Sequence, residues 1–261
     1  MRSLLGDTIL SVRNFVTQAA RRALGAVGIS ALPLKGPRFG LDVFRDLKTF
    51  APEHRFDVVL DVGANVGDFS VAAVAAFPSA RIWAVEPIGS TFRQLEKRVG
   101  RWQQINPVHC AMGAADGELT IRLQDVSQHN SLLLEAERQP ASGGPAPAKF
   151  ETVRITSLDA FGRAHGVETV DLLKLDVEGY EREVIAGAGE TLDRTAFVLC
   201  EAGLFASKHI HVPFETVAKL LWGKGFTLVA AYNMFYYFDN LPDGYGDVLF
   251  VNRSVCQLQR K

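Results

Sequence analysis

Seven charged side chains lie in the segment "DLLKLDVEGYEREVIAGAG", which runs from residue 171 to residue 189. Its leucines and first valine predict a buried strand, yet Lys174 and Asp176 interrupt the apolar pattern, and Glu178 and Glu181 follow directly. A charge in a buried strand costs free energy unless it is paired or used. Carboxylates in such a position can accept a proton from a substrate or bind a metal ion.

A second group of residues has the spacing of a nucleoside-binding site. In "LDVGANVGDFS", Gly63 and Gly67 clear the backbone for a ligand, and the helix that begins at Asp68 offers free N–H groups to an anion. Asp61 can accept hydrogen bonds from an ammonium group. Glu86, in "AVEP" at the end of the next strand, can accept both hydroxyls of a ribose. S-adenosylmethionine offers the matching carboxylate, ammonium and ribose.

The glycine loop is not the dinucleotide fingerprint. Its spacing is G-x-x-x-G rather than G-x-G-x-x-G, which disfavours a nucleotide-binding oxidoreductase. In the simplest alternative, Gly63 and Gly67 only form a tight turn and Glu86 is a solvated strand end. The combination of strand, turn, helix and Glu86 favours the binding site over that alternative.

The elements around these residues alternate between strand and helix from about residue 56 onward. This alternation predicts a doubly wound α/β sheet. The strands are expected at 56–63, 80–87, 105–113, 171–179, 196–203, 225–232 and 247–253, and the helices at 68–77, 90–99, 181–192 and 214–223. Because ligands bind beyond the carboxyl ends of parallel strands, Asp176, Glu178 and Glu201 should all face the reaction site.

Two regions lie outside this alternation. Residues 1–50 are expected to form an N-terminal helical extension, followed by one catalytic domain over 51–261. The first helix is basic and amphipathic, so it either packs on the domain or lies on an anionic membrane as a peripheral contact. The strand-like segments 117–124 and 150–161 predict a β-hairpin insertion, and the Pro/Gly/Ala-rich loop between them carries His129.

Composition excludes several other classes of protein. The 261 residues are 48% hydrophobic and 22% charged with a formal net charge of −1, which is ordinary for a globular chain and argues against a nucleic-acid partner. The three cysteines are far apart and show no metal-binding or disulfide spacing. No apolar run is long enough to span a bilayer, and we expect a cytoplasmic protein.

The motifs together resemble a known family. "LDVGANVGDFS", "AVEP", "SLDAF" and above all "LLKLDVEGYEREVIAGAGETL" are similar to the FkbM family of class I S-adenosylmethionine-dependent methyltransferases. The resemblance covers about residues 56–252, and the K-x-D-x-E-G-x-E block is its most specific part. It implies a Rossmann-like, mostly parallel sheet of seven strands whose last strand is antiparallel. It also implies methyl transfer to a hydroxyl, often on a sugar, glycolipid or secondary metabolite.

The resemblance also implies a set of cofactor-binding residues. Carried over by position, they are Asp61, Gly63, Ala64, Asn65, Gly67, Glu86, Pro87, Ala111 and Met112. The residues of the glycine loop would line the methionine end of S-adenosylmethionine and Glu86 its ribose. Ala111 and Met112, with Cys110, would lie near the adenine.

Methyl transfer to an aliphatic hydroxyl needs a base within hydrogen-bond reach and a well-positioned acceptor. Asp176 is the leading candidate for this base, with Glu178 and His211 behind it. The sequence predicts no metal site, although Asp176 and Glu201 could together hold one Mg²⁺ that polarises the hydroxyl. In the structural alternative, Lys174 pairs with Asp176 or Glu201, and Glu178 and Glu181 serve only the start of the next helix.

The acceptor itself has no motif. Four consecutive aromatic residues, 235–238, form either a hairpin on the sheet edge or a stacking wall for a sugar or lipid-like acceptor. The predicted function is therefore O-methylation of a small-molecule or glycan hydroxyl. The alternatives are an N-methyltransferase of the same fold, an oxidoreductase, and a binding module without turnover.

Overall fold

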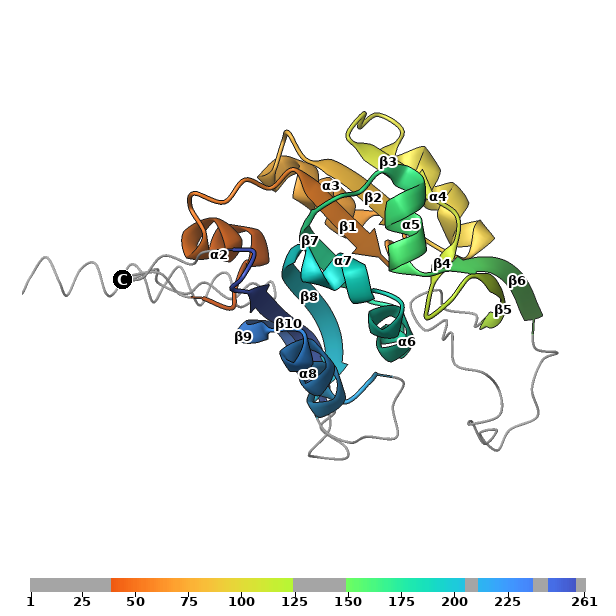
Figure 1. The fold of residues 1–261 in the computed structure, drawn as a ribbon. Coiled ribbons are helices and arrows are strands. Elements are labelled where there is room, and N and C mark those ends of the chain that lie inside the picture. The colour runs from red at the N-terminus through yellow and green to blue at the C-terminus, as the bar shows by residue number, and fades with distance from the viewer. Residues whose placement is uncertain (1–38, 124–148, 205–210, 237–243, 257–261) are drawn as a thin grey trace, which may run out of the picture. The chain divides into compact units, whose positions relative to one another are not determined.

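The computed structural model describes residues 39–123, 149–204, 211–236 and 244–256, and Figure 1 shows their fold. By its contacts the chain divides between Arg38 and Phe39, and every described residue belongs to the second unit. Helix α2 (Val43–Phe50) therefore belongs to the same compact unit as the sheet, although residues 1–50 were expected to form a separate extension. The expected amphipathic helix at the N-terminus and the loop with His129 lie outside the described residues.

The central sheet has seven strands in the order β3-β2-β1-β7-β8-β10-β9. Strands β3, β2, β1, β7 and β8 pair in parallel, whereas β10 runs antiparallel to both of its neighbours. The predicted fold class, a mostly parallel sheet with an antiparallel last strand, is confirmed. The strands are β1 (Val58–Val62), β2 (Arg81–Val85), β3 (Ile105–Val108), β7 (Val170–Leu175), β8 (Thr195–Gly203), β9 (Phe226–Tyr236) and β10 (Gly244–Asn252).

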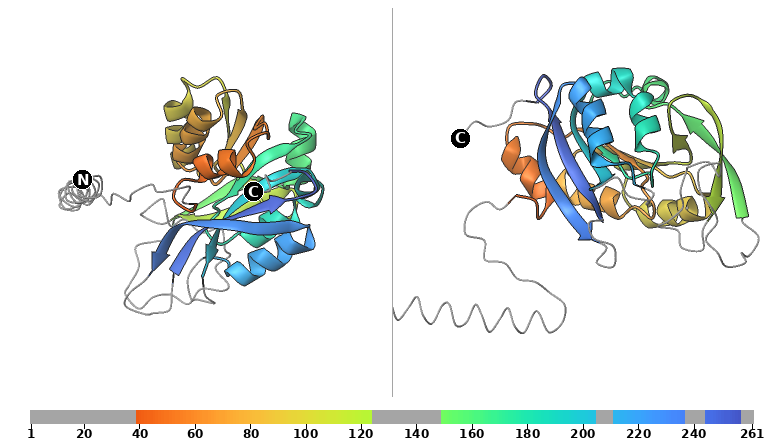
Figure 2. Two further views of the ribbon diagram at one scale, coloured as in Figure 1. Left: turned by 90° about the vertical axis from the view of Figure 1, so that its left-hand side faces the viewer. Right: turned by 90° about the horizontal axis from the view of Figure 1, so that it is seen from below.

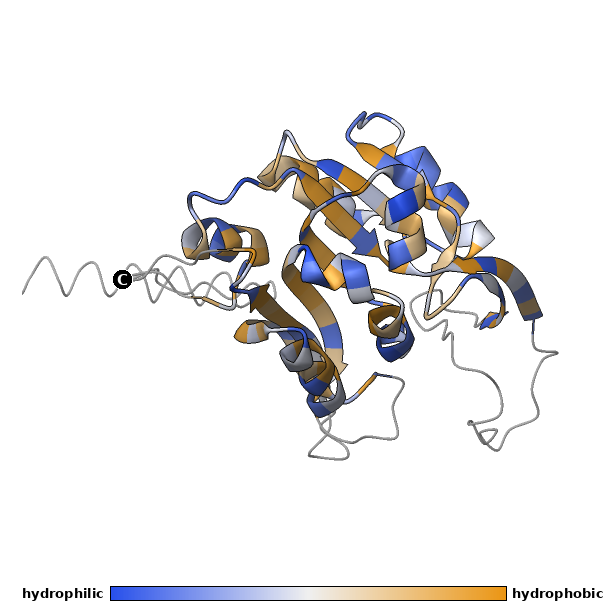
Figure 3. Cartoon of the chain, viewed as in Figure 1, coloured by the Kyte–Doolittle hydropathy of each residue, from blue (hydrophilic) through white to orange (hydrophobic). Residues whose placement is uncertain are grey.

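Helices cover both faces of this sheet, as Figure 2 shows. Successive strand residues face opposite sides, so Leu60 and Leu173 enter one apolar core while Val59 and Leu172 enter the other. The central strands are correspondingly hydrophobic along their length (Figure 3). Helices α5 (Leu158–His165), α6 (Glu181–Ala186), α7 (Gly189–Asp193) and α8 (Phe214–Gly223) contribute to the first core, and α2, α3 (Asp68–Ala76) and α4 (Gly89–Val99) to the second.

A small second sheet stands beside the main one. Strands β5 (Gly117–Leu123) and β6 (Lys149–Thr156) pair antiparallel, as the predicted hairpin insertion requires, and β4 (Ala111–Met112) pairs in parallel with β6. The single strand expected over 105–113 is therefore divided between the two sheets. Pro107 lacks an N–H and lies in β3, an edge strand of the main sheet, where a missing donor is tolerated.

The expected helix over 181–192 is also divided. Helix α6 ends before Gly187, and α7 begins two residues later. A Cβ at Gly187 would lie 2.0 Å from the carbonyl oxygen of Gly113, so the chain here approaches the backbone after β4 too closely for any side chain. The interruption therefore follows from contact with the insertion, a long-range event that helical periodicity does not report.

The amino end of the sheet is held together by one carboxylate. Asp171 accepts hydrogen bonds from the backbone N–H groups of Asp57 and Val58, both at 2.8 Å, and its other oxygen lies 2.9 Å from His54 Nε2. These contacts fix the start of β1 against β7. None of the helices within the described ranges combines the length and the apolar character needed to cross a bilayer.

Candidate active site

The loop after β1 is shaped by close approach to the end of β7. Gly63 has a φ of +79°, and its N–H and that of Ala64 donate to the carbonyl of Val85 at 3.0 and 2.9 Å. A Cβ at Gly63 would lie 1.8 Å from the carbonyl oxygen of Asp176. Only glycine fits here, and the predicted binding loop and the predicted catalytic residue are therefore in direct backbone contact.

Two further residues of this loop adopt the left-handed conformation. Asn65 has a φ of 48°, which asparagine tolerates better than most residues, and Gly67 has a φ of +88°. A Cβ at Gly67 would lie 2.7 Å from the side chain of Leu95 on α4. Gly67 thus serves helix packing, whereas Gly63 and Asn65 determine the course of the loop at the sheet's carboxyl edge.

Glu86, one residue beyond β2, connects two loops of the site. Its two carboxylate oxygens accept hydrogen bonds of 3.0 Å each from the N–H groups of Asn65 and Ile88. The residue is only 5% exposed, and burial raises its pKa to about 7. Next to it, the Pro87 carbonyl lies 2.9 Å from His109 Nε2. Each Glu86 oxygen retains a lone pair that can accept a further hydrogen bond.

The residues that the family resemblance assigns to the adenine end are buried in the first core. Ala111 and Met112 form β4, and both are only 1% exposed, as is expected of side chains in the first core. Cys110 is buried with them. A ligand near these residues would therefore meet backbone atoms rather than their side chains.

Lys174 is held between two carboxylates. Its Nζ lies 3.1 Å from Asp176 Oδ2, 3.3 Å from Asp61 Oδ1 and 3.1 Å from the carbonyl oxygen of Gly63. Burial lowers the pKa of Lys174, but Asp176 and Asp61 outweigh burial and raise it above its ordinary value, so the group is charged. The pairing of Lys174 with Asp176 is the structural alternative named above.

Asp61 is occupied by the protein's own groups. It is fully buried, and in addition to the Lys174 contact it accepts a 2.6 Å hydrogen bond from Ser70 Oγ on α3. The ammonium group that faces Asp61 in this structure is thus a lysine side chain. Asp61 therefore holds Lys174 in place, and Lys174 in turn contacts the loop after β1 at the Gly63 carbonyl.

Three carboxylates form a row across neighbouring strands, which we call the acidic row. Leu175 is in register with Cys200, so Asp176 and Glu201 follow at one level, and Glu201 is in turn paired with Asp247 on β10. Burial raises the pKa of Glu201 and of Asp247, and the nearby charge of Asp176 raises both further. The carboxyl edge of the sheet is therefore strongly negative.

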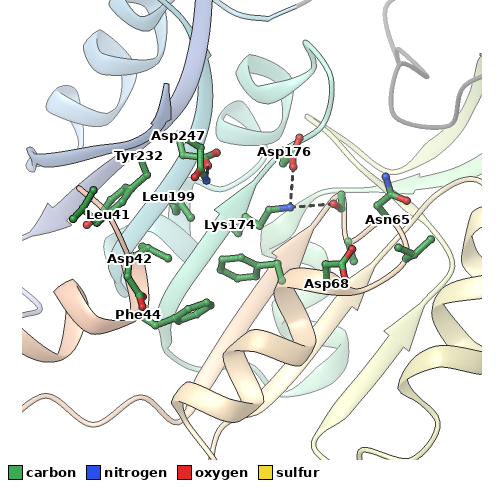
Figure 4. Close-up of a pocket in the computed structure, with 16 residues that line it drawn as sticks. Leu41, Asp42, Phe44, Asn65, Asp68, Lys174, Asp176, Leu199, Tyr232 and Asp247 are labelled. Carbon is green, nitrogen blue, oxygen red and sulfur yellow. Dashed lines mark hydrogen bonds and ion pairs between the residues drawn. The ribbon is translucent and has the colours of Figure 1, made fainter. Parts of the chain in front are cut away.

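A cavity of about 530 Å³ opens between this edge and helix α2 (Figure 4). Asp176 and Lys174 point into it, the loop from Gly63 to Phe69 forms one wall, and Tyr232 and Asp247 form another. The Asp176 side chain is 35% exposed. Four aspartates and one lysine line the cavity, so its charge favours a cationic ligand. The aspartates are Asp42, Asp68, Asp176 and Asp247.

Glu178 and His211 meet on the other side of Glu201. The Nδ1 atom of His211 lies 3.1 Å from Glu201 Oε2, and its ring stacks on Tyr245 with centroids 4.1 Å apart. Ligand atoms of Glu178, Glu201 and His211 all lie within 4.8 Å of one another. Burial lowers the pKa of His211, but Glu201 outweighs burial and raises it. The three predicted catalytic residues are thus divided between the cavity and this neighbouring cluster.

Residues 61–228 match the family described as the Methyltransferase FkbM domain. The chain belongs to this family. The predicted family and the predicted class of enzyme, a methyltransferase, are both confirmed, and the oxidoreductase alternative is dropped.

This FkbM domain is similar to several named proteins and to one solved structure. The 2-O-methyltransferase NoeI of Sinorhizobium fredii is 26% identical, with 85% of this chain and 90% of that protein covered. The hexuronic acid methyltransferase AglP of Haloferax volcanii is 26% identical, with 69% and 66% covered. The crystal structure of methyltransferase FkbM from Methylobacillus flagellatus is 14% identical with a TM-score of 0.49. It covers 81% of this chain, which spans 48% of that one.

Sequence reasoning missed the role of Glu181 in the FkbM motif. Helix α6 begins at this residue as expected, but its side chain is fully buried. Its Oε1 accepts hydrogen bonds from the N–H groups of Val177 and Gly179, at 3.2 and 3.3 Å, and burial raises its pKa to about 7. Glu181 therefore holds the loop that presents Asp176 and Glu178.

Sequence reasoning also missed Asp247 in this FkbM domain. It lies on β10 at the cavity wall and accepts a 2.7 Å hydrogen bond from Asn233 Nδ2. The one available signal is its position, because a charged residue precedes the apolar run "VLFV". That signal does not state which strand pairs with β10, and so it does not bring Asp247 to the same edge as Asp176.

Proposed function

We propose that this protein is an S-adenosylmethionine-dependent O-methyltransferase that acts on a hydroxyl of a sugar or secondary metabolite. The observation that carries the proposal is the backbone contact between Gly63 and Asp176 at one cavity. It puts the loop that resembles a donor-binding loop next to a half-buried carboxylate able to receive a proton. Methyl donor and acceptor must meet in such an arrangement, because the transfer is a direct displacement.

The charge of the cavity supports a cationic donor. S-adenosylmethionine carries a sulfonium and an ammonium group, and the cavity offers four aspartates against one lysine. Its ribose hydroxyls would donate hydrogen bonds to the Glu86 carboxylate, which two backbone N–H groups already orient. The donor would thus extend along the loop from the cavity toward the end of β2.

Asp176 is the proposed proton acceptor. S-adenosylmethionine, when bound, would supply the methyl group for direct displacement by the acceptor oxygen, with S-adenosylhomocysteine as the leaving group. The hydroxyl proton passes to Asp176 and then to water. Lys174, at 3.1 Å, fixes the direction of this carboxylate, and the Lys174 side chain is only 11% exposed. The loop at Gly63 contacts the backbone of Asp176 and Lys174 contacts its carboxylate, so the carboxylate is held beside the loop that would bind the donor.

The acceptor class rests on the relatives and on the cavity wall. NoeI is named as a 2-O-methyltransferase, and AglP as a methyltransferase of a hexuronic acid. Phe44, Phe69 and Tyr232 line the cavity and offer ring faces against which a sugar can pack. A saccharide hydroxyl is therefore the first acceptor to test, and a hydroxylated secondary metabolite the second.

The proposal is tested in two steps. Calorimetric titration should give one-to-one binding of S-adenosylhomocysteine, with NAD as a negative control. Radiolabelled S-adenosylmethionine is then offered with panels of saccharides, hydroxylated metabolites and small amines. Transfer to amines alone would establish the N-methyltransferase alternative. Cofactor binding without transfer to any acceptor would favour a binding module, and absence of cofactor binding would refute the proposal.

A further inference from the structure

The cluster of Glu178, Glu201 and His211 lies next to the cavity but does not line it. Glu201 links the two, because it is in register with Asp247 at the cavity wall and carries His211 on its other side. The cluster offers two carboxylates and one imidazole. Carboxylate and imidazole ligands together are typical of sites that bind divalent transition-metal ions, whereas an acid–base pair would need only two of these three residues.

The contact between His211 and Glu201 is unusual. The Nδ1 and Oε2 atoms are 3.1 Å apart, but their contact lacks the angles of a hydrogen bond, and neither atom has another hydrogen-bond partner within the described part of the chain. Both atoms are buried, and the His211 side chain is only 7% exposed. Leaving two buried polar atoms without a hydrogen bond costs free energy, so this pair calls for a third participant.

A metal ion explains this geometry. Adjacent ligands of an octahedral ion with bonds of about 2.1 Å lie about 3.0 Å apart and direct their lone pairs at the ion instead of at each other. The separation of His211 Nδ1 and Glu201 Oε2 has this value, and Glu178 contributes a carboxylate within 4.8 Å of both.

We propose that Glu178, Glu201 and His211 bind one divalent transition-metal ion of the Mn²⁺ or Zn²⁺ class at the acceptor side of the cavity. The imidazole ligand favours these ions over Mg²⁺, which prefers oxygen ligands alone. This differs from the Asp176–Glu201 magnesium pair considered from the sequence, because Asp176 faces Lys174 instead. The ion would hold and polarise an acceptor oxygen. That role rests on the proposed methyl transfer, whereas binding of the ion does not.

Calorimetric titration of the metal-stripped full chain with MnCl₂ and ZnCl₂ tests the proposal, with MgCl₂ for comparison. We expect one-to-one binding of Mn²⁺ or Zn²⁺ at submillimolar concentration. Glu201→Gln and His211→Gln should each weaken it at least tenfold. Glu183→Gln is the matched control, because it makes the same change of charge on the adjacent helix α6 and should leave metal affinity unchanged.

Separate outcomes decide the two proposals. S-adenosylhomocysteine affinity is measured on every variant and shows whether that variant is folded. Glu178→Gln provides a third variant. Absence of one-to-one binding, or binding that survives both Glu201→Gln and His211→Gln, overturns the metal site. Loss of metal binding with cofactor binding intact supports it. Metal binding without cofactor binding would refute the proposed methyl transfer and leave the metal site standing.

Discussion

Gly63 in "LDVG" and Asp176 in "KLDVEG" lie 113 positions apart, yet a Cβ on the first would lie 1.8 Å from the carbonyl oxygen of the second. The glycine therefore does more than permit a turn. It allows the end of β7 to come within contact of the loop after β1, and in doing so it brings a carboxylate to the wall of the cavity.

Gly63→Ala should accordingly be severely disruptive. The new methyl group meets backbone atoms that have no room to move, and the residue must also keep a φ of +79°. We expect the free energy of unfolding to fall by at least about 3 kcal/mol and cofactor binding to be lost. Gly166→Ala is the control, because Gly166 has a φ of +63° with open space around it and should cost only about 1 kcal/mol. Equal losses measured by denaturant unfolding would contradict the packing argument.

Lys174→Met should destabilise the fold far more than a surface lysine does. The substitution keeps the apolar stem but leaves Asp61, which is fully buried, without its cation. Removing one partner of a buried pair typically costs about 3–5 kcal/mol. Combining it with Asp61→Asn should restore part of this loss. Lys219→Met removes an exposed pair with Glu215 and should leave the free energy of unfolding almost unchanged.

Asp176→Asn should separate chemistry from binding. The amide keeps the size of the side chain but accepts protons poorly, so kcat should fall by about 100-fold or more. The affinity for S-adenosylhomocysteine should change only a few-fold, because the Gly63 contact involves the backbone of Asp176 rather than its side chain. Single-turnover kinetics and calorimetry measure the two quantities. An unchanged kcat would remove Asp176 from its proposed role.

Stability should depend on the protonation of His54. The Asp171 carboxylate raises the pKa of His54 from 6.5 to about 9, so the folded protein holds this proton more tightly than the unfolded chain. The stabilisation is complete below pH 6.5 and is lost as pH rises toward 9. His54→Gln should lower the free energy of unfolding by about 1–2 kcal/mol at pH 6 and by much less at pH 9.5. Urea unfolding at both pH values checks this, and an equal loss at both would rule the ion pair out as its cause.

The sequence was sufficient for the parts of the fold that local pattern determines. Apolar runs such as that of β7 and the glycines after β1 predict the strands, their order of appearance and the binding loop. A break in a helix that is caused by contact with a distant part of the chain could not be predicted in this way. Gly187 divides a predicted helix because it meets Gly113, and nothing in the helical pattern reports that contact.

The candidate site shows the same limit. Asp176 was identified because it stands in a recognisable motif at the end of a strand. Its position beside Glu201 and Asp247 depends on the register of β7, β8 and β10. That register comes from pairing between strands that are up to 71 positions apart in the sequence. For Glu181, the sequence indicates only a helix start. Its side chain is buried and accepts a hydrogen bond from the preceding loop, and the sequence pattern does not predict this contact.

The contact between Gly113 and Gly187 determines how this domain can be altered. It is the place where the chain leaving β4 touches the break between α6 and α7. A Cβ at Gly187 would meet the backbone of Gly113, whereas one at Gly113 would meet the Ile155 side chain. An exchange of strands β5 and β6 between relatives would therefore have to retain Gly187. A side chain there would push the graft against the start of α7, next to the helix whose Glu181 holds the loop after β7.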